Sequence, residues 1–210
     1  MKQALWTGVM RVGPIGTNCY FLKNGKEGDE IVLVDPGDEP EQILEEVRRQ
    51  KAKVAAVLLT HAHYDHILAV PAVKREWPEA PVMILKDERP MLTDSRLNTS
   101  FIQTDVTVTP DRYLSDGDVL TLLEREIRVM ASPGHTAGSC CYYVPSDAAL
   151  FAGDTVFRGS YGRTDLPTGS PEAMADTLEK LLTALPPDTA VYPGHGPGTT
   201  IGRERLAEGF

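Results

Sequence analysis

The sequence has little of several features that mark common protein classes. Three cysteines in 210 residues, two of them adjacent, do not make a disulfide framework. No apolar run approaches the roughly 18 residues of a spanning helix, and the N-terminus lacks the apolar stretch of a secretory signal. Basic residues number 21 against 30 acidic ones, and this net charge of −9 argues against a nucleic-acid surface. We therefore expect a cytoplasmic protein with no membrane or nucleic-acid partner.

The composition is that of a globular chain, with 41% hydrophobic and 24% charged residues. Strand-like and helix-like periodicities alternate, which predicts an α/β protein, and no linker divides residues 1–210, so one domain is expected. Strands are predicted at residues 5–12, 18–23, 31–34, 54–59, 82–85, 119–123, 127–131, 140–144, 148–152 and 189–192. Helices are predicted from residue 40, at 67–77 and at 171–185, and the polar stretch 86–112 as a covering loop with one short helix. Two sheets flanked by helices would accommodate these elements.

All five histidines and one notable aspartate directly follow predicted strands, and none lies within a predicted helix or strand. They are His61, His63, His66, His135, Asp154 and His195. In layered α/β folds, side chains at the carboxyl ends of buried strands converge on one crevice. We therefore expect these residues to meet at one edge of the sheets.

The spacing of the first three histidines indicates metal binding. His61 and His63 stand two residues apart and project to the same side of an extended segment, while Asp65 and His66 turn toward a neighbouring position. Two adjacent cations need about three to four nitrogen or oxygen ligands each. We therefore predict two sites that share a bridging carboxylate. The first comprises His61, His63, His135 and Asp154, and the second Asp65, His66, His195 and Asp154.

Four short motifs carry a resemblance to a known family. They are residues 60–66 (THAHYDH), 133–136 (PGHT), 153–155 (GDT) and 193–196 (PGHG). In this order and spacing the chain resembles the metallo-β-lactamase superfamily, which implies a four-layer αββα sandwich with a metal cleft at one edge. Residues 157–165 and 195–202 further resemble the short bacterial glyoxalase II-like hydrolases, which cleave thioesters of the hydroxyacyl-glutathione type.

The resemblance implies a binuclear thioester hydrolase acting on a small-molecule, glutathione-derived substrate. Zinc is the first choice for the two divalent cations, with iron and manganese as alternatives, since histidine and carboxylate ligands accept all three. A bound water with its pKa lowered to about 7 would supply the attacking hydroxide. Asp65 is then predicted to act as ligand and proton acceptor, and Arg163 and Tyr161 as substrate contacts. The sequence leaves the oligomeric state open.

Other interpretations of the same ligands stay open. A mononuclear iron persulfide dioxygenase would use His61, His135 and Asp154 or a similar facial set. A metal-bound module without turnover is the non-catalytic alternative. A β-lactamase is disfavoured, because the chain shows no export signal and retains Asp65. Arg163 either binds a substrate carboxylate or pairs with Asp165.

Overall fold

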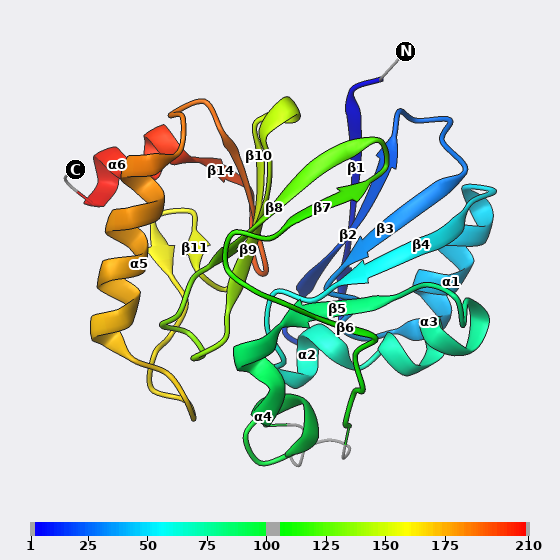
Figure 1. Cartoon of the computed structure of the whole chain (residues 1–210), viewed down its shortest axis with the longest axis horizontal. Coiled ribbons are helices and arrows are strands. Elements are labelled where there is room, and N and C mark those ends of the chain that lie inside the picture. The colour runs from blue at the N-terminus through cyan, green and yellow to red at the C-terminus, as the bar shows by residue number, and fades with distance from the viewer. Residues whose placement is uncertain (1–2, 100–105, 209–210) are drawn as a thin grey trace.

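The computed structural model describes residues 3–99 and 106–208 as four layers, in the order helix, sheet, sheet, helix (Figure 1). Two six-stranded sheets face each other, and helices cover the outer face of each. The αββα sandwich expected from the sequence is confirmed. None of the helices in the described ranges is long and apolar enough to cross a membrane.

The N-terminal half of the chain forms the first sheet, in the order β1-β2-β3-β4-β5-β6. Strands β1 to β3 pair antiparallel, and strands β3 to β6 pair parallel. Strand β2 is buried on both faces, with Phe21 turned to the outer helices and Leu22 to the second sheet. The strands are β1 (Leu5–Val12), β2 (Thr17–Asn24), β3 (Glu30–Val34), β4 (Lys53–Leu58), β5 (Val82–Leu85) and β6 (Arg112–Leu114).

The C-terminal half forms the second sheet, in the order β14-β13-β10-β9-β8-β7. Only the pairing of β10 with β13 is parallel in this sheet. A short hairpin, β11 (Val156–Phe157) with β12 (Ser160–Tyr161), stands apart from it. The sheet strands are β7 (Val119–Leu122), β8 (Arg125–Ala131), β9 (Cys140–Val144), β10 (Ala149–Gly153), β13 (Ala190–Pro193) and β14 (Thr199–Thr200).

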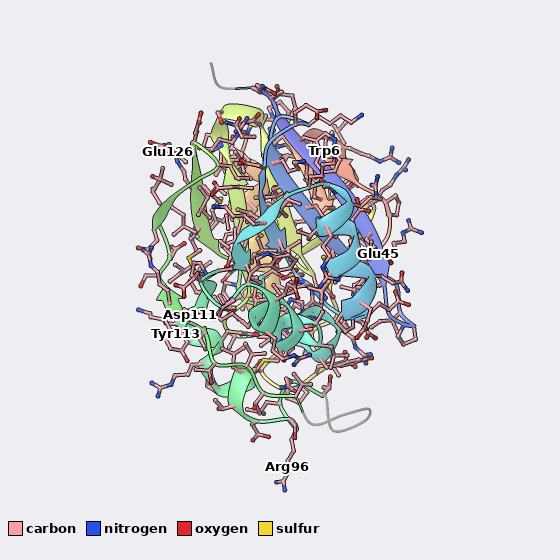
Figure 2. All side chains as sticks on the ribbon, turned by 90° about the vertical axis from the view of Figure 1, so that its right-hand side faces the viewer. Trp6, Glu45, Arg96, Asp111, Tyr113 and Glu126 are labelled. Atoms are coloured by element: carbon pink, nitrogen blue, oxygen red, sulfur yellow. The ribbon has the colours of Figure 1, made fainter. Side chains whose placement is uncertain are left out.

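Helices pack on both outer faces because each carries one apolar side. Helix α1 buries Ile43 and Val47 against the first sheet and exposes Glu45, as Figure 2 shows from the helical side. Ser170 is the N-cap of helix α5, and its hydroxyl accepts from the Ala173 amide at 3.2 Å. The helices are α1 (Pro40–Arg49), α2 (Tyr64–Ile67), α3 (Val70–Glu76), α4 (Arg89–Thr93), α5 (Pro171–Ala184) and α6 (Ile201–Glu208), with 3₁₀ helices η1 (Lys86–Glu88) and η3 (Pro145–Asp147).

The structure differs from the sequence prediction in its short elements. The helix expected at 67–77 is the shorter α3, which the separate helix α2 precedes. Pro71 stands in the first turn of α3, where its missing N–H costs nothing. The stretch 86–112 holds η1, α4 and the start of β6, while its residues 100–105 lie outside the described part. Strands β6, β11, β12 and β14 and helix α6 are absent from the sequence prediction.

Candidate metal centre

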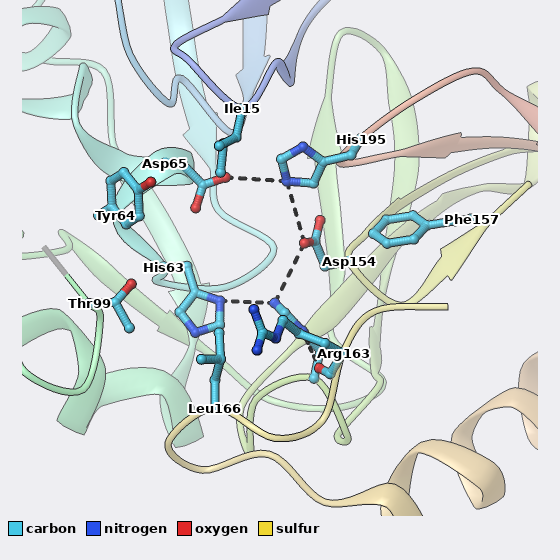
Figure 3. A pocket seen from close by; sticks show the side chains of 11 residues that line it. Ile15, His63, Tyr64, Asp65, Thr99, Asp154, Phe157, Arg163, Leu166 and His195 are labelled. Atoms are coloured by element: carbon cyan, nitrogen blue, oxygen red, sulfur yellow. Dashed lines mark hydrogen bonds and ion pairs between the residues drawn. The ribbon is translucent and has the colours of Figure 1, made fainter. Parts of the chain in front are cut away.

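All seven predicted ligands lie together at one edge of the sandwich, where strands β4, β8, β10 and β13 end. Figure 3 shows the side chains among them that line a cavity, pointing toward one another from separate segments. Asp65 and His66 turn toward a neighbouring position, as expected, because both lie within the short helix α2. The helical turn brings both side chains to His195, while the ring of His66 also lies 4.0 Å from that of His61.

The first ligand set consists of three buried imidazoles. His63 Nδ1 lies 2.9 Å from His135 Nε2. The ring of His61 is centred 4.9 Å from that of His63 and 4.8 Å from that of His135. One nitrogen from each ring falls within a group whose members are all within 4.8 Å of one another. That spacing suits three ligands around one cation.

The second set combines a carboxylate with two imidazoles, and Asp154 stands between the sets. Asp65 Oδ2 lies 3.2 Å from His66 Nε2 and 3.3 Å from His195 Nε2. Asp154 Oδ1 is 3.5 Å from His66 Nε2, while its Oδ2 is 3.5 Å from both His135 Nε2 and His195 Nε2. Asp154 therefore contacts members of both sets, as a bridging carboxylate must.

Hydrogen bonds behind the imidazoles determine which ring nitrogen carries the proton. His135 Nδ1 lies 2.7 Å from the carbonyl oxygen of Arg163, which can only accept. The Thr60 hydroxyl donates to Asp35 Oδ2 at 2.7 Å and therefore accepts from His61 Nδ1 at 3.1 Å. In both rings Nδ1 is protonated, so Nε2 presents its lone pair to the centre.

Burial makes the first set neutral. It lowers the pKa of His63 to about 3 and holds the pKa of His61 and of His135 below the ordinary value. Neighbouring imidazoles lower the pKa of His61 and His63 further, because each disfavours a second positive charge. Neutral imidazoles are the form that binds a metal.

The second set is charged in the metal-free chain. Burial lowers the pKa of His66, but the carboxylates of Asp65, Asp154 and Asp35 outweigh this and raise it well above the ordinary value. Burial also lowers the pKa of His195, but its bond to Asp65 and the charges of Asp154 and Asp65 together outweigh this and raise it. In the metal-free chain, protonated imidazoles thus balance the negative charge of these carboxylates. A bound cation would displace those protons.

The residues fit a metal because their inward-facing atoms have no other partner. Within the described residues, five buried side-chain nitrogen or oxygen atoms lack a hydrogen bond, and four belong to this cluster. They are Nε2 of His61, His63 and His66, and Oδ1 of Asp154. Each unpaired buried polar atom costs about 1–3 kcal/mol, so four of them gathered at one place indicate a ligand that satisfies them. Imidazole and carboxylate donors are those that zinc, iron and manganese accept.

Glycines let the ligand segments approach closely. A Cβ atom on Gly194 would stand 2.1 Å from Asp154 Oδ1 and 2.8 Å from His66 Cε1. One on Gly162 would stand 1.9 Å from the carbonyl oxygen of Asp154. No side chain fits at these distances, so the motif glycines are required by the packing around the ligands.

A cavity of about 510 Å³ opens in front of the ligands. Ile15 from the β1–β2 turn, Phe157 from β11 and Leu166 give it apolar walls, while Tyr64 and Thr99 add hydroxyl groups. Figure 3 shows these side chains around the ligands. The cavity therefore offers a small organic substrate an apolar wall beside the metal ligands.

The two predicted substrate contacts lie in different surroundings. Arg163 lines the cavity, and its guanidinium also makes two bonds of 2.7 Å to the carboxylate of Asp165. That pair lowers the pKa of Asp165 to about 2. Arg163 therefore pairs with Asp165, one of the two alternatives from the sequence, and still lines the cavity. Tyr161 on β12 is 49% exposed and lies outside the cavity lining, so its contact with substrate stays a prediction.

Sequence reasoning missed two buried acids that support the ligands. Asp35 follows β3 and lies 3.0 Å from His66 Nδ1, so the rule that polar groups gather after strands would have found it. Glu88 lies in η1, within a polar stretch that shows no periodicity, and accepts a hydrogen bond from the Ala62 amide between two ligands. Nothing in the sequence around Glu88 indicates this burial.

The chain is similar to known proteins along most of its length. The family model described as Metallo-beta-lactamase superfamily matches residues 12–195. The probable metallo-hydrolase YqgX of Bacillus subtilis is 37% identical over 91% of this chain and 90% of its own. Hydroxyacylglutathione hydrolase GloC of Haemophilus influenzae is 28% identical over 92% of each chain.

Two solved structures share the fold and more than a third of the sequence. BLEG-1, described as a B3 metallo-beta-lactamase, has a TM-score of 0.89 and 39% identity, covering 96% of this chain and 97% of its own. TTHA1623, described in a di-iron-bound form, has a TM-score of 0.84 and 38% identity, covering 95% and 98%. The matches therefore span the sandwich and the whole ligand cluster.

Proposed function

Because this chain belongs to the metallo-β-lactamase superfamily and is a metal-dependent hydrolase, we propose that it cleaves thioesters of the hydroxyacyl-glutathione type at a two-metal centre. The two ligand sets joined by Asp154 are the observation that carries this proposal. A relative named for hydroxyacylglutathione hydrolysis and another described with two iron ions support it.

The chain would divide its donors between two cations. His61, His63 and His135 would hold one, Asp65, His66 and His195 the other, and Asp154 would contact both. When bound, such cations lower the pKa of a water to about 7 and polarise a carbonyl oxygen. Zinc is the first ion to test, and iron the second.

The protein's own groups would orient the reaction and manage the proton. Water adds to the thioester carbonyl carbon, its proton passes to Asp65, and the carbon–sulfur bond breaks to release a thiolate. The Thr17 hydroxyl donates to Asp65 Oδ2 at 2.6 Å and keeps this carboxylate in place. The thiolate needs no acid catalyst because its conjugate acid has a pKa near 8.5.

Arg163 is the proposed contact for the thiol half of the substrate. Its guanidinium is exposed and held by Asp165, an arrangement that a substrate carboxylate can replace with the same two bonds. The walls formed by Ile15 and Phe157 would then hold the acyl group away from water. A substrate with one apolar end and one anionic end suits this arrangement.

β-Lactam hydrolysis is a second candidate, because BLEG-1 carries that description at 39% identity. The leaving group argues for the thioester. An amide nitrogen must be protonated as it leaves, and outside the ligand set the described cavity-lining residues include no carboxylic acid or imidazole. A thiolate leaves without this help.

The test is the loss of thioester absorbance from S-lactoylglutathione, with protein reconstituted in zinc or in iron. We expect a kcat/KM of about 10⁴ M⁻¹s⁻¹ or more in one metal form. Asp154→Asn, treated in the same way, is the matched control and is expected to lose bound metal and at least about 100-fold in rate. The same proteins are assayed for turnover of a chromogenic cephalosporin. They are also assayed for oxygen uptake with glutathione persulfide in an oxygen electrode.

Each of the three substrates distinguishes one candidate function from the other two. Background rates on S-lactoylglutathione in both metal forms would overturn the thioesterase proposal. Faster turnover of the cephalosporin would replace it with β-lactam hydrolysis. Oxygen uptake with one iron per chain would replace it with persulfide oxidation at a mononuclear centre.

A further inference from the structure

The carboxylate of Glu88 is buried and bonded only to groups that donate. The side chain comes from η1, directly after β5, and the residue is 1% exposed. Its Oε1 accepts from the Ala62 amide at 2.9 Å, and its Oε2 accepts from the Gly138 amide and the Thr136 hydroxyl, both at 3.0 Å. Three donors from two separate segments therefore converge on one carboxylate.

The two segments that Glu88 joins are those that supply the first ligand set. Ala62 stands between His61 and His63, and Thr136 follows His135. The two segments are more than 70 residues apart in the chain, and His63 and His135 must nevertheless bring their nitrogens within 2.9 Å. One carboxylate thus spans both sides of this set.

The second ligand set is supported from elsewhere. Asp65 is held by Thr17, and His66 by Asp35. The segment that carries His195 is held by the Asn18 side chain, which donates to the carbonyl oxygens of Pro193 and Gly196 at 2.9 Å. The described hydrogen bonds of Glu88 reach none of these residues. Asp35 also reaches His61 through the Thr60 hydroxyl, so it supports both sets, whereas Glu88 supports the first set alone.

The burial of this acid is energetically costly. Burial raises the pKa of Glu88 to about 7, although three donors oppose the rise. A well-packed apolar residue would avoid that cost, since buried charge is weak as a source of stability. The loop at Gly138 also lies directly on η1, where an added Cβ atom would stand 2.2 Å from the Glu88 nitrogen. A carboxylate at this point serves geometry rather than stability.

We propose that Glu88 is a positioning residue that fixes the segment of His61 and His63 against the segment of His135, and so sets the metal affinity of the first site alone. This inference rests on the proposed two-metal centre. Loss of Glu88 would let the imidazoles separate without altering any ligand.

Glu88→Gln is the variant that tests the inference. An amide keeps one acceptor oxygen, so it cannot accept from Ala62 on one side and from Thr136 and Gly138 on the other. We expect the folded variant to keep one tight cobalt(II) and to bind the second about 10- to 100-fold more weakly than the wild type. Titration of the metal-free protein, with the cobalt absorption spectrum as readout, measures both steps.

Two controls separate positioning from general damage. Glu204→Gln removes another buried carboxylate with two donors, Gly159 and Thr199, and is expected to keep both metals. Thr136→Val removes one donor to Glu88 and should weaken only the first site, while Thr136→Ser keeps the hydroxyl and should restore it. These variants test the inference even where Glu88→Gln does not fold.

The outcomes are distinguishable from those of the proposed function. A wild-type protein that binds fewer than two cations overturns the two-metal centre, and this inference with it. Two equally tight cations in wild type, Glu88→Gln and Thr136→Val overturn the inference alone. Equal weakening of both sites in Glu88→Gln also overturns it, because the effect would then not be confined to the first set.

Discussion

Asp35 orients one imidazole of each ligand set. Its Oδ2 lies 3.0 Å from His66 Nδ1 and accepts from the Thr60 hydroxyl, which in turn accepts from His61 Nδ1. Its Oδ1 accepts from the Thr60 amide at 2.8 Å, so the carboxylate cannot rotate freely. Partners of this kind fix the ring orientation and the protonated nitrogen of a ligand. The two sets therefore share Asp35 behind them and Asp154 between them.

The close approach of Gly194 to Asp154 can be tested by substitution. Replacement by alanine would place a Cβ atom 2.1 Å from Asp154 Oδ1, so either the carboxylate or the His195 segment must move. Because Asp154 contacts both sets, we expect Gly194→Ala to lose bound metal and about 100-fold in activity. Metal content by elemental analysis and the thioesterase rate measure the two effects.

The matched control lies two residues further along. Gly196 has a φ of 73°, and a Cβ atom there would meet nothing within 4 Å. Asparagine tolerates this left-handed conformation, so Gly196→Asn is expected to keep both metals. If Gly194→Ala keeps its metals as well, the close approach to Asp154 is not a requirement of the centre.

The sequence predicts the ligands but not their supports. His61, His63 and the other ligands stand in dense motifs after strands, so spacing alone brings them to one edge. Glu88 accepts two of its three bonds from backbone amides, which a sequence does not display. The sequence predicts Arg163 as a substrate contact, whereas the hydrogen bond that its carbonyl oxygen accepts from His135 Nδ1 depends on a loop conformation.

For helices and strands, the length of the element decides whether the sequence predicts it. Strand β2 and helix α5 carry enough residues for their periods to show, and both lie close to the predicted positions. Strands β11 and β14 have two residues each, too few to show a period. They form because adjacent strands pair with them. The sequence does not predict helix α2 either, because its four residues are too few to show a helical period.

The hairpin β11–β12 gives the prediction at the element scale. Phe157 of this hairpin lines the cavity, and its turn at Gly159 is held by Glu204 of α6, which accepts from the Gly159 amide at 2.6 Å. We expect Glu204→Gln to loosen the hairpin and raise KM about fivefold, the equivalent of about 1 kcal/mol. The value of kcat and the metal content should not change. An unchanged KM would show that the hairpin needs no tie to α6.

At the scale of the whole molecule, Arg125 joins the two halves. It stands at the start of β8, the end of that strand remote from the metal ligands, and its side chain is fully buried. It donates to Asp147 at 2.9 Å and to Asn24 at 2.8 Å, while Asp147 accepts from the Leu5 amide at 2.7 Å. The first sheet is thereby tied to the second at the edge opposite the cavity.

We expect Arg125→Met to lower the stability of the metal-free protein by about 3–5 kcal/mol, because Asp147, Asn24 and the carbonyl oxygen of Leu123 all lose their buried donor. For a chain of this length that is a fall of about 10 °C in Tm, measurable by calorimetry. Arg128→Met on the same strand is the control, since its side chain is 54% exposed and its loss should cost less than about 0.5 kcal/mol. Similar Tm values for the two variants would refute a joining role for Arg125.

The pH dependence of unfolding tests the buried charge of Glu88. Burial raises its folded pKa to about 7 from the ordinary 4.5, so the folded state binds a proton that the unfolded state has released between these values. Stability from this group is therefore complete below pH 4.5 and is lost as pH rises through 7, by about 3 kcal/mol. Glu88→Gln cannot titrate, so its unfolding free energy, measured by denaturant on metal-free protein, should fall less than that of the wild type between pH 5 and 8. Parallel curves for the two proteins would mean that Glu88 keeps an ordinary pKa in the fold.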